Sequence, residues 1–162
     1  MLRIAGCEKS SIVDGPGFRY TLFLQGCNHH CDGCQNPATW SMDGGTEMEI
    51  SDIIADIKKA YYIDGVTISG GEPLEQADEL IYLLKCLKEE NYHIILFSGY
   101  TFEEIMARAE MLACLPYIDV LIDGEYKKEQ RSLELRFRGS VNQRVIDVPE
   151  SIKEGKPVLT DW

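Results

Sequence analysis

Residues 18–36 read FRYTLFLQGCNHHCDGCQN, and this stretch joins a predicted strand to a loop that carries three cysteines. Aromatic and branched residues dominate positions 18–24, which is typical of a β-strand. Cys27, Cys31 and Cys34 follow at once in the spacing Cys-x3-Cys-x2-Cys, with no fourth cysteine close behind. Closed iron–sulfur and structural zinc sites take four protein ligands. Three thiolates on one loop can hold three irons of a four-iron cluster and leave the fourth iron open for chemistry.

Two histidines within the loop offer an alternative metal site. Three thiolates and one imidazole make a legitimate zinc site, with His29 or His30 as the fourth ligand. Such a site would be cramped, because zinc sites usually join two separated pairs of ligands. The spacing therefore favours an iron–sulfur cluster, and we expect both histidines to be loop residues beside it.

Length and composition limit the classes of protein to which the chain can belong. At 162 residues, with 44% apolar residues, it is long enough for one domain, which we expect to span 1–162. The net charge of −11 argues against a nucleic-acid partner. The sequence contains neither a signal-peptide pattern nor an apolar run of membrane-spanning length, so we expect a cytoplasmic protein with no membrane partner. In a reducing compartment the scattered cysteines Cys7, Cys86 and Cys114 are expected to be packing residues.

Beyond the cysteine loop, short β-rich runs alternate with helical periodicity. This order predicts parallel strands joined by helices, in an α/β fold with a mostly parallel sheet. The units are too few to close an eight-stranded barrel, so we expect an open, partial β/α barrel. Strands are predicted at 18–24, 66–69, 93–97, 119–122 and 144–148, an alternating β-like pattern at 133–138, and helices at 51–61, 75–90 and 101–113.

Polar and glycine residues gather where the predicted parallel strands end. The cysteine loop follows the first strand, Gly70-Gly71-Glu72 the second, Ser98 the third, and Asp123 the fourth. Chemistry in open α/β sheets collects at the carboxyl ends of the strands. Two glycines at such an end allow a ligand to approach the backbone closely, and a glutamate can accept a hydrogen bond from an ammonium group. We therefore expect these four segments to form one site.

The cysteine loop followed by Ser69-Gly70-Gly71-Glu72-Pro73 resembles the radical S-adenosylmethionine enzymes. The segments 13–19 (VDGPGFR), 23–27 (FLQGC), 98–101 (SGYT), 120–124 (VLIDG) and 138–143 (RGSVNQ) make the chain similar to activators of glycyl-radical proteins, above all those of anaerobic ribonucleoside-triphosphate reductase. The resemblance runs from about residue 12 to 148. The wider superfamily usually has an aromatic residue before the third cysteine, whereas this chain, like the reductase activators, has Gly33.

The resemblance implies a [4Fe–4S] cluster on Cys27, Cys31 and Cys34, with S-adenosylmethionine on the open iron. Reductive cleavage of that cofactor would give a 5′-deoxyadenosyl radical, which generates a glycyl radical on the reductase. A flavodoxin-type or thiol donor would supply the electron, and no side chain acts as a general acid or base. The residues expected to contact the cofactor are Gly33, Cys34, Gln35, Gly70, Gly71, Glu72, Ser98 and Asp123. Asn142 either contacts the cofactor or orders the last loop.

Two other functions compete with this interpretation. The first is activation of a different glycyl-radical enzyme, of the pyruvate formate-lyase type, or radical chemistry on a small molecule. Small-molecule enzymes usually need extra elements to enclose the substrate, and 162 residues leave little room for them. The second is a non-catalytic role as a zinc module or electron carrier, which would not cleave S-adenosylmethionine.

Overall fold

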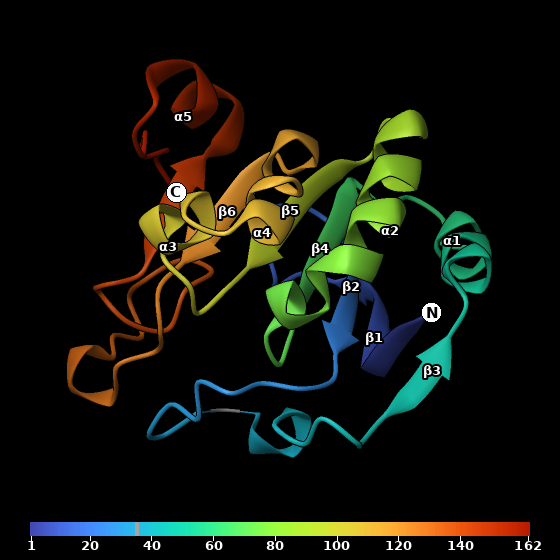
Figure 1. The fold of residues 1–162 in the computed structure, drawn as a ribbon, viewed down its shortest axis with the longest axis horizontal. Coiled ribbons are helices and arrows are strands. Elements are labelled where there is room, and N and C mark those ends of the chain that lie inside the picture. Colours follow the sequence, from blue (N-terminus) through green and yellow to red (C-terminus); the bar gives the residue numbers. More distant parts are fainter. Residues whose placement is uncertain (35) are drawn as a thin grey trace.

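The computed structural model describes residues 1–34 and 36–162, and its centre is an open seven-stranded sheet (Figure 1). The strands lie in the order β3-β1-β2-β4-β5-β6-β7, and the sheet does not close on itself. The strands are β1 (Leu2–Ser11), β2 (Arg19–Leu24), β3 (Thr46–Met48), β4 (Gly65–Gly70), β5 (His93–Phe97), β6 (Val120–Asp123) and β7 (Arg144–Asp147). The helices are α1 (Ile50–Lys58), α2 (Ala77–Glu89), α3 (Phe102–Met106), α4 (Ala109–Leu112) and α5 (Val148–Glu154).

The four central strands are parallel, as the alternating sequence pattern predicts. β2 pairs with β4, β4 with β5, and β5 with β6, all in parallel register. The edges are antiparallel, because β1 pairs with both β2 and β3, and β7 pairs with β6. The prediction of an open, partial α/β barrel is thus confirmed, and the carboxyl ends of the parallel strands point toward the segment between β2 and β3 (Figure 1).

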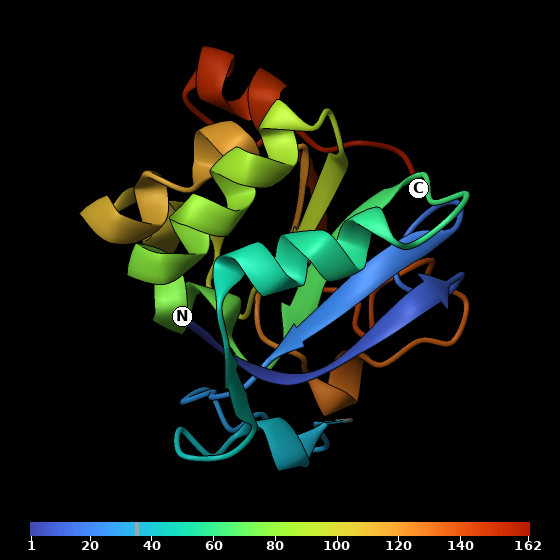
Figure 2. The same ribbon diagram turned by 90° about the vertical axis from the view of Figure 1, so that its right-hand side faces the viewer.

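Helices cover one face of the sheet, and irregular segments lie over the other (Figure 2). On α2, leucines at helical spacing are completely buried, and each contributes about 1.5–3 kcal/mol through loss of contact with water. These residues are Leu80, Leu83, Leu84 and Leu87. The opposite face carries a smaller apolar cluster of Ile95, Val120, Ile122 and Val145, with Phe137 packed against it. Because irregular segments cover this second face less completely than helices cover the first, a cavity can form there.

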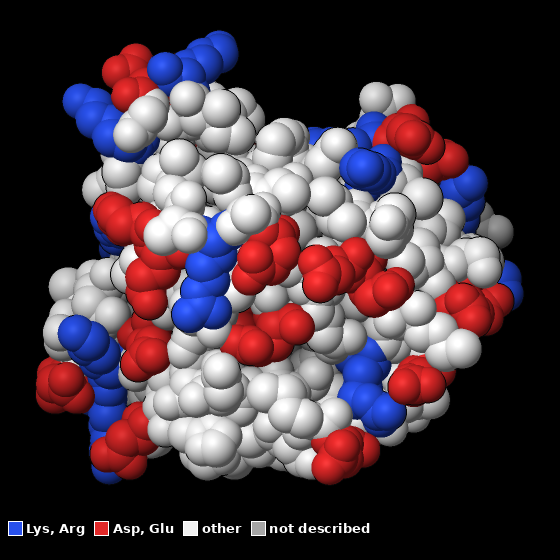
Figure 3. Space-filling view, viewed as in Figure 1, with Lys and Arg blue, Asp and Glu red and all other residues white. Residues whose placement is uncertain are grey.

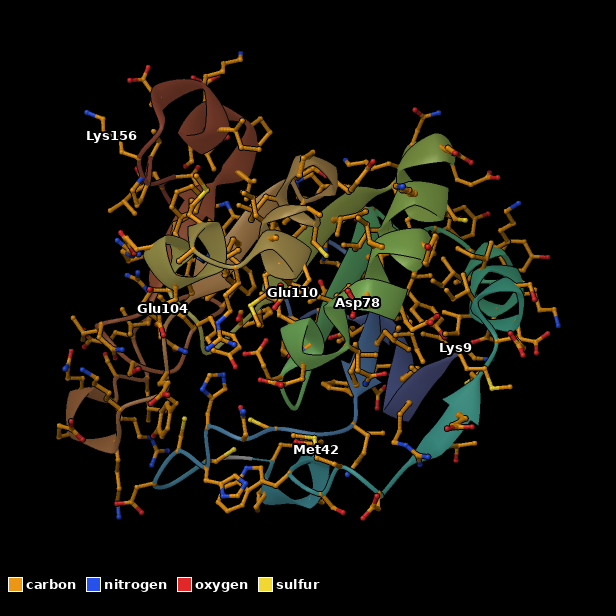
Figure 4. The ribbon with its side chains drawn as sticks, viewed as in Figure 1. Lys9, Met42, Asp78, Glu104, Glu110 and Lys156 are labelled. Carbon is orange, nitrogen blue, oxygen red and sulfur yellow. The ribbon has the colours of Figure 1, made fainter. Side chains whose placement is uncertain are left out.

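Acidic side chains lie over the helical face. They gather across the middle of the surface in Figure 3, where few basic side chains interrupt them. Asp78 on α2, Glu104 on α3 and Glu110 on α4 are exposed members of this group (Figure 4). Within the described residues, no helix has the length and apolar character needed to cross a lipid bilayer.

Three local features differ from the sequence predictions. The antiparallel strands β1 and β3 were not predicted. The helix predicted at 101–113 is two helices, because Arg108 is extended, with φ −120° and ψ 117°. The predicted start of α3 is confirmed, since Thr101 and Glu104 form a reciprocal capping box.

The third difference is the stretch 133–138, which is not a strand. Its residues form turns and bends, and Phe137 has a positive φ of 61°, which a regular strand does not allow. Leu133, Leu135 and Phe137 instead line a cavity. The alternating pattern therefore comes from contact with that cavity and not from strand pairing.

Candidate functional site

Three cysteines meet in an open cavity of about 840 Å³ at the carboxyl ends of the parallel strands. Cys27, Cys31 and Cys34 all line it, together with strand-end residues of β4 and β5. Backbone hydrogen bonds hold the start of the cysteine loop against the segment that follows it. The Gly26 amide donates to the Thr39 carbonyl (2.7 Å) and the Cys27 amide to the Trp40 carbonyl (3.1 Å). Figure 4 shows this region at the carboxyl ends of the strands, where Met42 is labelled. The predicted convergence of the cysteines is therefore present.

The electrostatic surroundings of the thiols show why they need a cationic partner. Burial raises the pKa of the Cys27 thiol, although the backbone amides of His29 and His30 oppose this by stabilising the thiolate. Burial also raises the pKa of Cys31, and the charge of Glu125 adds to the effect. Iron would reverse this balance, because a coordinated thiol loses its proton outright.

An unpaired indole also fits a bound cluster. Trp40 lines the cavity, and its buried Nε1 has no hydrogen-bond acceptor among the described residues. A buried donor without an acceptor costs about 1–3 kcal/mol. A bound sulfur- or oxygen-rich group could accept this hydrogen bond. The donor set of three thiols beside an unsatisfied N–H is therefore suited to an iron–sulfur group.

The two histidines of the loop are engaged elsewhere, as the cluster interpretation predicts. The His29 ring lies between two carboxylates, with Nε2 2.8 Å from Glu72 and Nδ1 3.0 Å from Glu125. Burial lowers the pKa of His29, but the two carboxylates outweigh it and the net direction is upward. His30 stacks on Trp40, with ring centroids 4.6 Å apart. The described residues contain no group of three or more His, Cys, Asp or Glu side chains placed to share one metal ion.

The glycine pair after β4 allows close contact between protein segments. A Cβ on Gly70, which has φ +105°, would lie 2.3 Å from the Leu24 amide nitrogen. A Cβ on Gly71 would lie 2.4 Å from the Gly26 carbonyl oxygen. From the sequence, this glycine pair is expected to admit an approaching ligand. In the structure the approaching group is the backbone leading into the cysteine loop, while both glycines also line the cavity.

Glu72 is completely buried, and its carboxylate is already surrounded by donors. Its Oε1 accepts from the Gly99 amide (2.7 Å) and its Oε2 from the Leu74 amide (2.9 Å). The Ser98 hydroxyl donates to both oxygens at 3.0 Å, and His29 approaches Oε1. In the structure this carboxylate joins the ends of β4 and β5, and its contact with the cofactor stays a prediction.

Asp123 is also surrounded by donors of the protein. It is 1% exposed, and its carboxylate accepts from the Phe102 amide at the start of α3 (2.7 Å). Arg144 on β7 donates to both of its oxygens, through Nε to Oδ1 (3.0 Å) and Nη2 to Oδ2. Asp123 does not line the cavity, whereas its neighbours Ile122 and Gly124 do. In the structure the strand-end aspartate therefore accepts from the first amide of α3 and pairs with Arg144, and its contact with the cofactor stays a prediction.

The remaining residues that the sequence assigns to the site lie in different surroundings. Ser98 lines the cavity and supports Glu72. Gly33 has φ +75°, and a Cβ there would lie 3.2 Å from Lys128 Cδ, so the cysteine loop packs closely against the segment between β6 and β7. Asn142 orders the last loop, because its Nδ2 donates to the Glu125 carbonyl (2.8 Å). Gln35 lies outside the described residues.

Several cavity residues escaped the sequence analysis. They come from the segment between β6 and β7, which supplies Arg131, Leu133, Phe137 and Arg138 to the wall, and from Trp40 after the cysteines. The aromatic residue so close to the third cysteine was an available signal for Trp40. In the long connection, the 138–143 stretch was a signal for Arg138, whereas the alternating pattern at 133–138 led to the prediction of a strand.

Comparison with known proteins agrees with this geometry. A family model described as "4Fe-4S single cluster domain" matches residues 13–146. The fold and the site therefore define a protein that carries one four-iron cluster. The cluster predicted from the three-cysteine loop is thus confirmed, and the zinc alternative is wrong.

Similar proteins of known name identify the family within the class of four-iron-cluster proteins. The chain is 43% identical to the anaerobic ribonucleoside-triphosphate reductase-activating protein of Vibrio cholerae, over 82% of this chain and 89% of the relative. The protein of the same name from Enterobacteria phage T4 is 38% identical, over 88% and 90%. The pyruvate formate-lyase-activating enzyme of Clostridium pasteurianum is 39% identical, but the match covers 78% of this chain and only 56% of that enzyme. The chain belongs to the family of anaerobic ribonucleoside-triphosphate reductase-activating proteins.

Proposed function

We propose that this protein activates an anaerobic ribonucleoside-triphosphate reductase by generating a glycyl radical on it. The observation that carries the proposal is the meeting of three loop cysteines with Gly70, Gly71 and Ser98 around one open cavity. The relatives that share the chain's length are named as activators of that reductase. We propose further that residues 1–162 act as one domain, since a single sheet runs from β1 to β7.

Cys27, Cys31 and Cys34 would hold the [4Fe–4S] cluster and leave one iron without a protein ligand. When bound, the cluster and S-adenosylmethionine together supply the carbon radical that removes a hydrogen atom from a glycine of the partner. The cysteine thiols serve as thiolates in this role, so cluster binding releases their protons.

The chain's own residues position the cofactor and shield it. Gly70, Gly71 and Ser98 line the cavity beside the cysteines and are the residues that we assign to the cofactor's methionine end. The absence of a Cβ on both glycines lets the backbone that leads into the cysteine loop pack against this turn, so the cluster and the turn lie on the same cavity. Phe23, Phe97 and Phe137 give the same cavity apolar walls, which limit water around a reactive group. The adenine end is assigned to the backbone near Gly33, Cys34 and Gln35.

The partner must bring its glycine to the open side of this cavity. The segment between β6 and β7 forms part of the wall, and its Leu133 is 87% exposed. A partner segment can therefore reach the cavity without passing through the sheet. We propose the cytoplasm as the working compartment, with a flavodoxin-type or thiol donor as the electron source. The described cysteines form no disulfide with one another, which suits a reducing compartment.

A second target is a glycyl-radical enzyme of the pyruvate formate-lyase type. The 39% identity to the Clostridium pasteurianum enzyme favours this alternative. The chain spans about half of that enzyme's length, whereas it spans nine-tenths of the reductase activators. The length match favours the reductase.

The deciding experiment is an electron paramagnetic resonance measurement under anaerobic conditions. Iron-loaded protein, reductant and S-adenosylmethionine are mixed with the anaerobic reductase, and in parallel with pyruvate formate-lyase. We expect a glycyl-radical doublet only with the reductase, accompanied by 5′-deoxyadenosine. A doublet only with pyruvate formate-lyase would reassign the target. Absence of both products, from protein shown to hold the cluster, would refute the proposed function.

A further inference from the structure

His29 lies within the cysteine loop, yet its ring is directed toward carboxylates of two other segments. Nε2 lies 2.8 Å from Oε1 of Glu72, which follows β4, and Nδ1 lies 3.0 Å from Oε1 of Glu125, which follows β6. The side chain is 8% exposed, although it belongs to an irregular loop. One imidazole therefore joins three segments that are far apart in the sequence.

The structure contains a fitted space for this ring. A Cβ on Gly99 would lie 2.6 Å from His29 Cδ2 and 2.7 Å from Nε2, so any larger residue there would displace the imidazole. Gly99 has no left-handed φ, and its backbone conformation therefore does not itself require glycine. Tyr100 packs edge-on against the same ring, with centroids 4.6 Å apart. Gly99 and Tyr100 come from the end of β5, which makes a fourth segment in contact with His29.

Glu72 connects the His29 ring to residues of the cavity wall. Its Oε1 accepts from the Gly99 amide (2.7 Å) and the Ser98 hydroxyl (3.0 Å) as well as contacting His29. Ser98, Gly99 and His29 itself all line the cavity. A shift of the His29 ring would therefore move the cysteine loop relative to the strand ends assigned to the cofactor.

We propose that His29 is a positioning residue, which holds the cysteine loop at a fixed distance from the Gly70-Gly71-Glu72 turn. The inference rests on the proposed function, because the distance matters only if one ligand contacts both the cluster and that turn. His29 is not a ligand of the cluster. Its removal leaves all three thiolates in place, so cluster assembly persists while the binding of S-adenosylmethionine weakens.

Four variants test this role. His29→Ala removes both contacts, and His29→Gln keeps one amide donor that can reach Glu72. Gly99→Ala keeps every polar group but places a methyl group where the imidazole lies. His30→Ala is the matched control, because His30 is the exposed neighbouring histidine of the same loop and stacks on Trp40.

The measurement is the dissociation constant of S-adenosylmethionine, taken from its effect on the spectrum of the reduced cluster, without any reductase present. Iron per chain and thermal unfolding are recorded for each variant. We expect normal iron content throughout, and roughly tenfold weaker binding for His29→Ala and Gly99→Ala, the factor that the loss of one charge-assisted hydrogen bond brings. His29→Gln should recover part of the affinity, and His30→Ala should match the wild type.

The possible negative results distinguish the proposed function from the positioning role of His29. If the wild type holds its cluster but S-adenosylmethionine leaves the spectrum unchanged, the proposed function fails and this inference fails with it. If the wild type binds the cofactor and His29→Ala binds it equally well, only the inference is overturned. Loss of iron from His29→Ala and His29→Gln, with normal iron in His30→Ala, would also overturn it, because it would make His29 part of the cluster site itself.

Discussion

The two ends of the parallel strands each bury a charged side chain, but they enclose it differently. At the amino end, Arg19 is 2% exposed, and its guanidinium donates to the Thr67 hydroxyl (2.8 Å) and to the carbonyls of Val66 (3.1 Å) and His93 (3.0 Å). Burial lowers the pKa of Arg19 to about 10, against the opposing charges of Asp64 and Asp119. These hydrogen-bond acceptors belong to neighbouring strands, so this end is closed and fixed.

At the carboxyl end, buried Glu72 receives its hydrogen bonds from loops and strand ends. His29, Leu74, Ser98 and Gly99 supply them, and three of these residues also line the open cavity. The two ends of the same strands therefore have different roles. The amino end supports the stability of the fold, whereas the carboxyl end arranges a site whose parts come from separate connections.

The largest expected effect comes from removing a cysteine at the carboxyl end. Cys31→Ala should lose the cluster and lower the yield of 5′-deoxyadenosine more than about hundredfold, because direct ligands matter more than the outer partners that cost 10- to 100-fold. Iron analysis and product chromatography measure the two effects. The matched control is Cys7→Ala, since Cys7 is exposed and does not line the cavity. Full iron content and normal turnover in Cys31→Ala would contradict the assigned ligand set.

The second prediction concerns the closed end. Arg19→Met should lower the free energy of unfolding by about 3 kcal/mol, because it leaves several buried acceptors without a donor. Urea denaturation of the metal-free chain measures this loss, and Lys59→Met serves as an exposed control. Iron content per folded molecule should stay normal. An Arg19→Met variant with the same urea midpoint as the wild type would show that these buried hydrogen bonds do not stabilise the fold. A variant that folds normally but takes up no iron would show that the amino end of the strands affects the cluster site.

The third prediction tests whether Asp123 supports the fold or contacts the cofactor. Arg144→Met removes the ion-pair partner of this buried carboxylate and should cost about 2 kcal/mol of stability. Glu103→Gln removes the exposed partner of the same arginine and should cost less than about 1 kcal/mol. Both variants should bind S-adenosylmethionine with affinities within about twofold of the wild type. A strong loss of affinity in Arg144→Met, at unchanged stability, would support the cofactor role that the sequence predicts for Asp123.

The smallest expected effect is a gain in the free energy of unfolding. Tyr62, in the loop before β4 at the amino end, has φ +59° and is 94% exposed. Tyr62→Gly should raise stability by about 0.5 kcal/mol, because glycine adopts this conformation without the cost that other residues carry. Urea denaturation with replicate titrations can resolve this difference. Reduced stability would mean that the tyrosine ring makes contacts that outweigh the backbone strain.

Sequence patterns predicted well the features that depend on local periodicity. The parallel strands, α2 and the capping box of α3 follow from apolar spacing and short-range hydrogen bonds, and the cysteine spacing identified the cluster. The hydrogen-bond partners of Glu72 and Asp123 could not be predicted in this way. Residues at a strand end can face the cavity or a neighbouring segment, and donors distant in the sequence decide which, such as His29 for Glu72 and Arg144 for Asp123.

The central claim is that the open end holds a cluster with one iron left free for S-adenosylmethionine. Electron–nuclear double resonance of the reduced cluster, with S-adenosylmethionine labelled with ¹⁵N at its amino group, tests this claim most directly. We predict a ¹⁵N coupling to the cluster that disappears when unlabelled cofactor replaces the labelled one. A reduced four-iron cluster that shows no coupling at saturating cofactor would contradict the claim, because its fourth iron would then not bind the amino group.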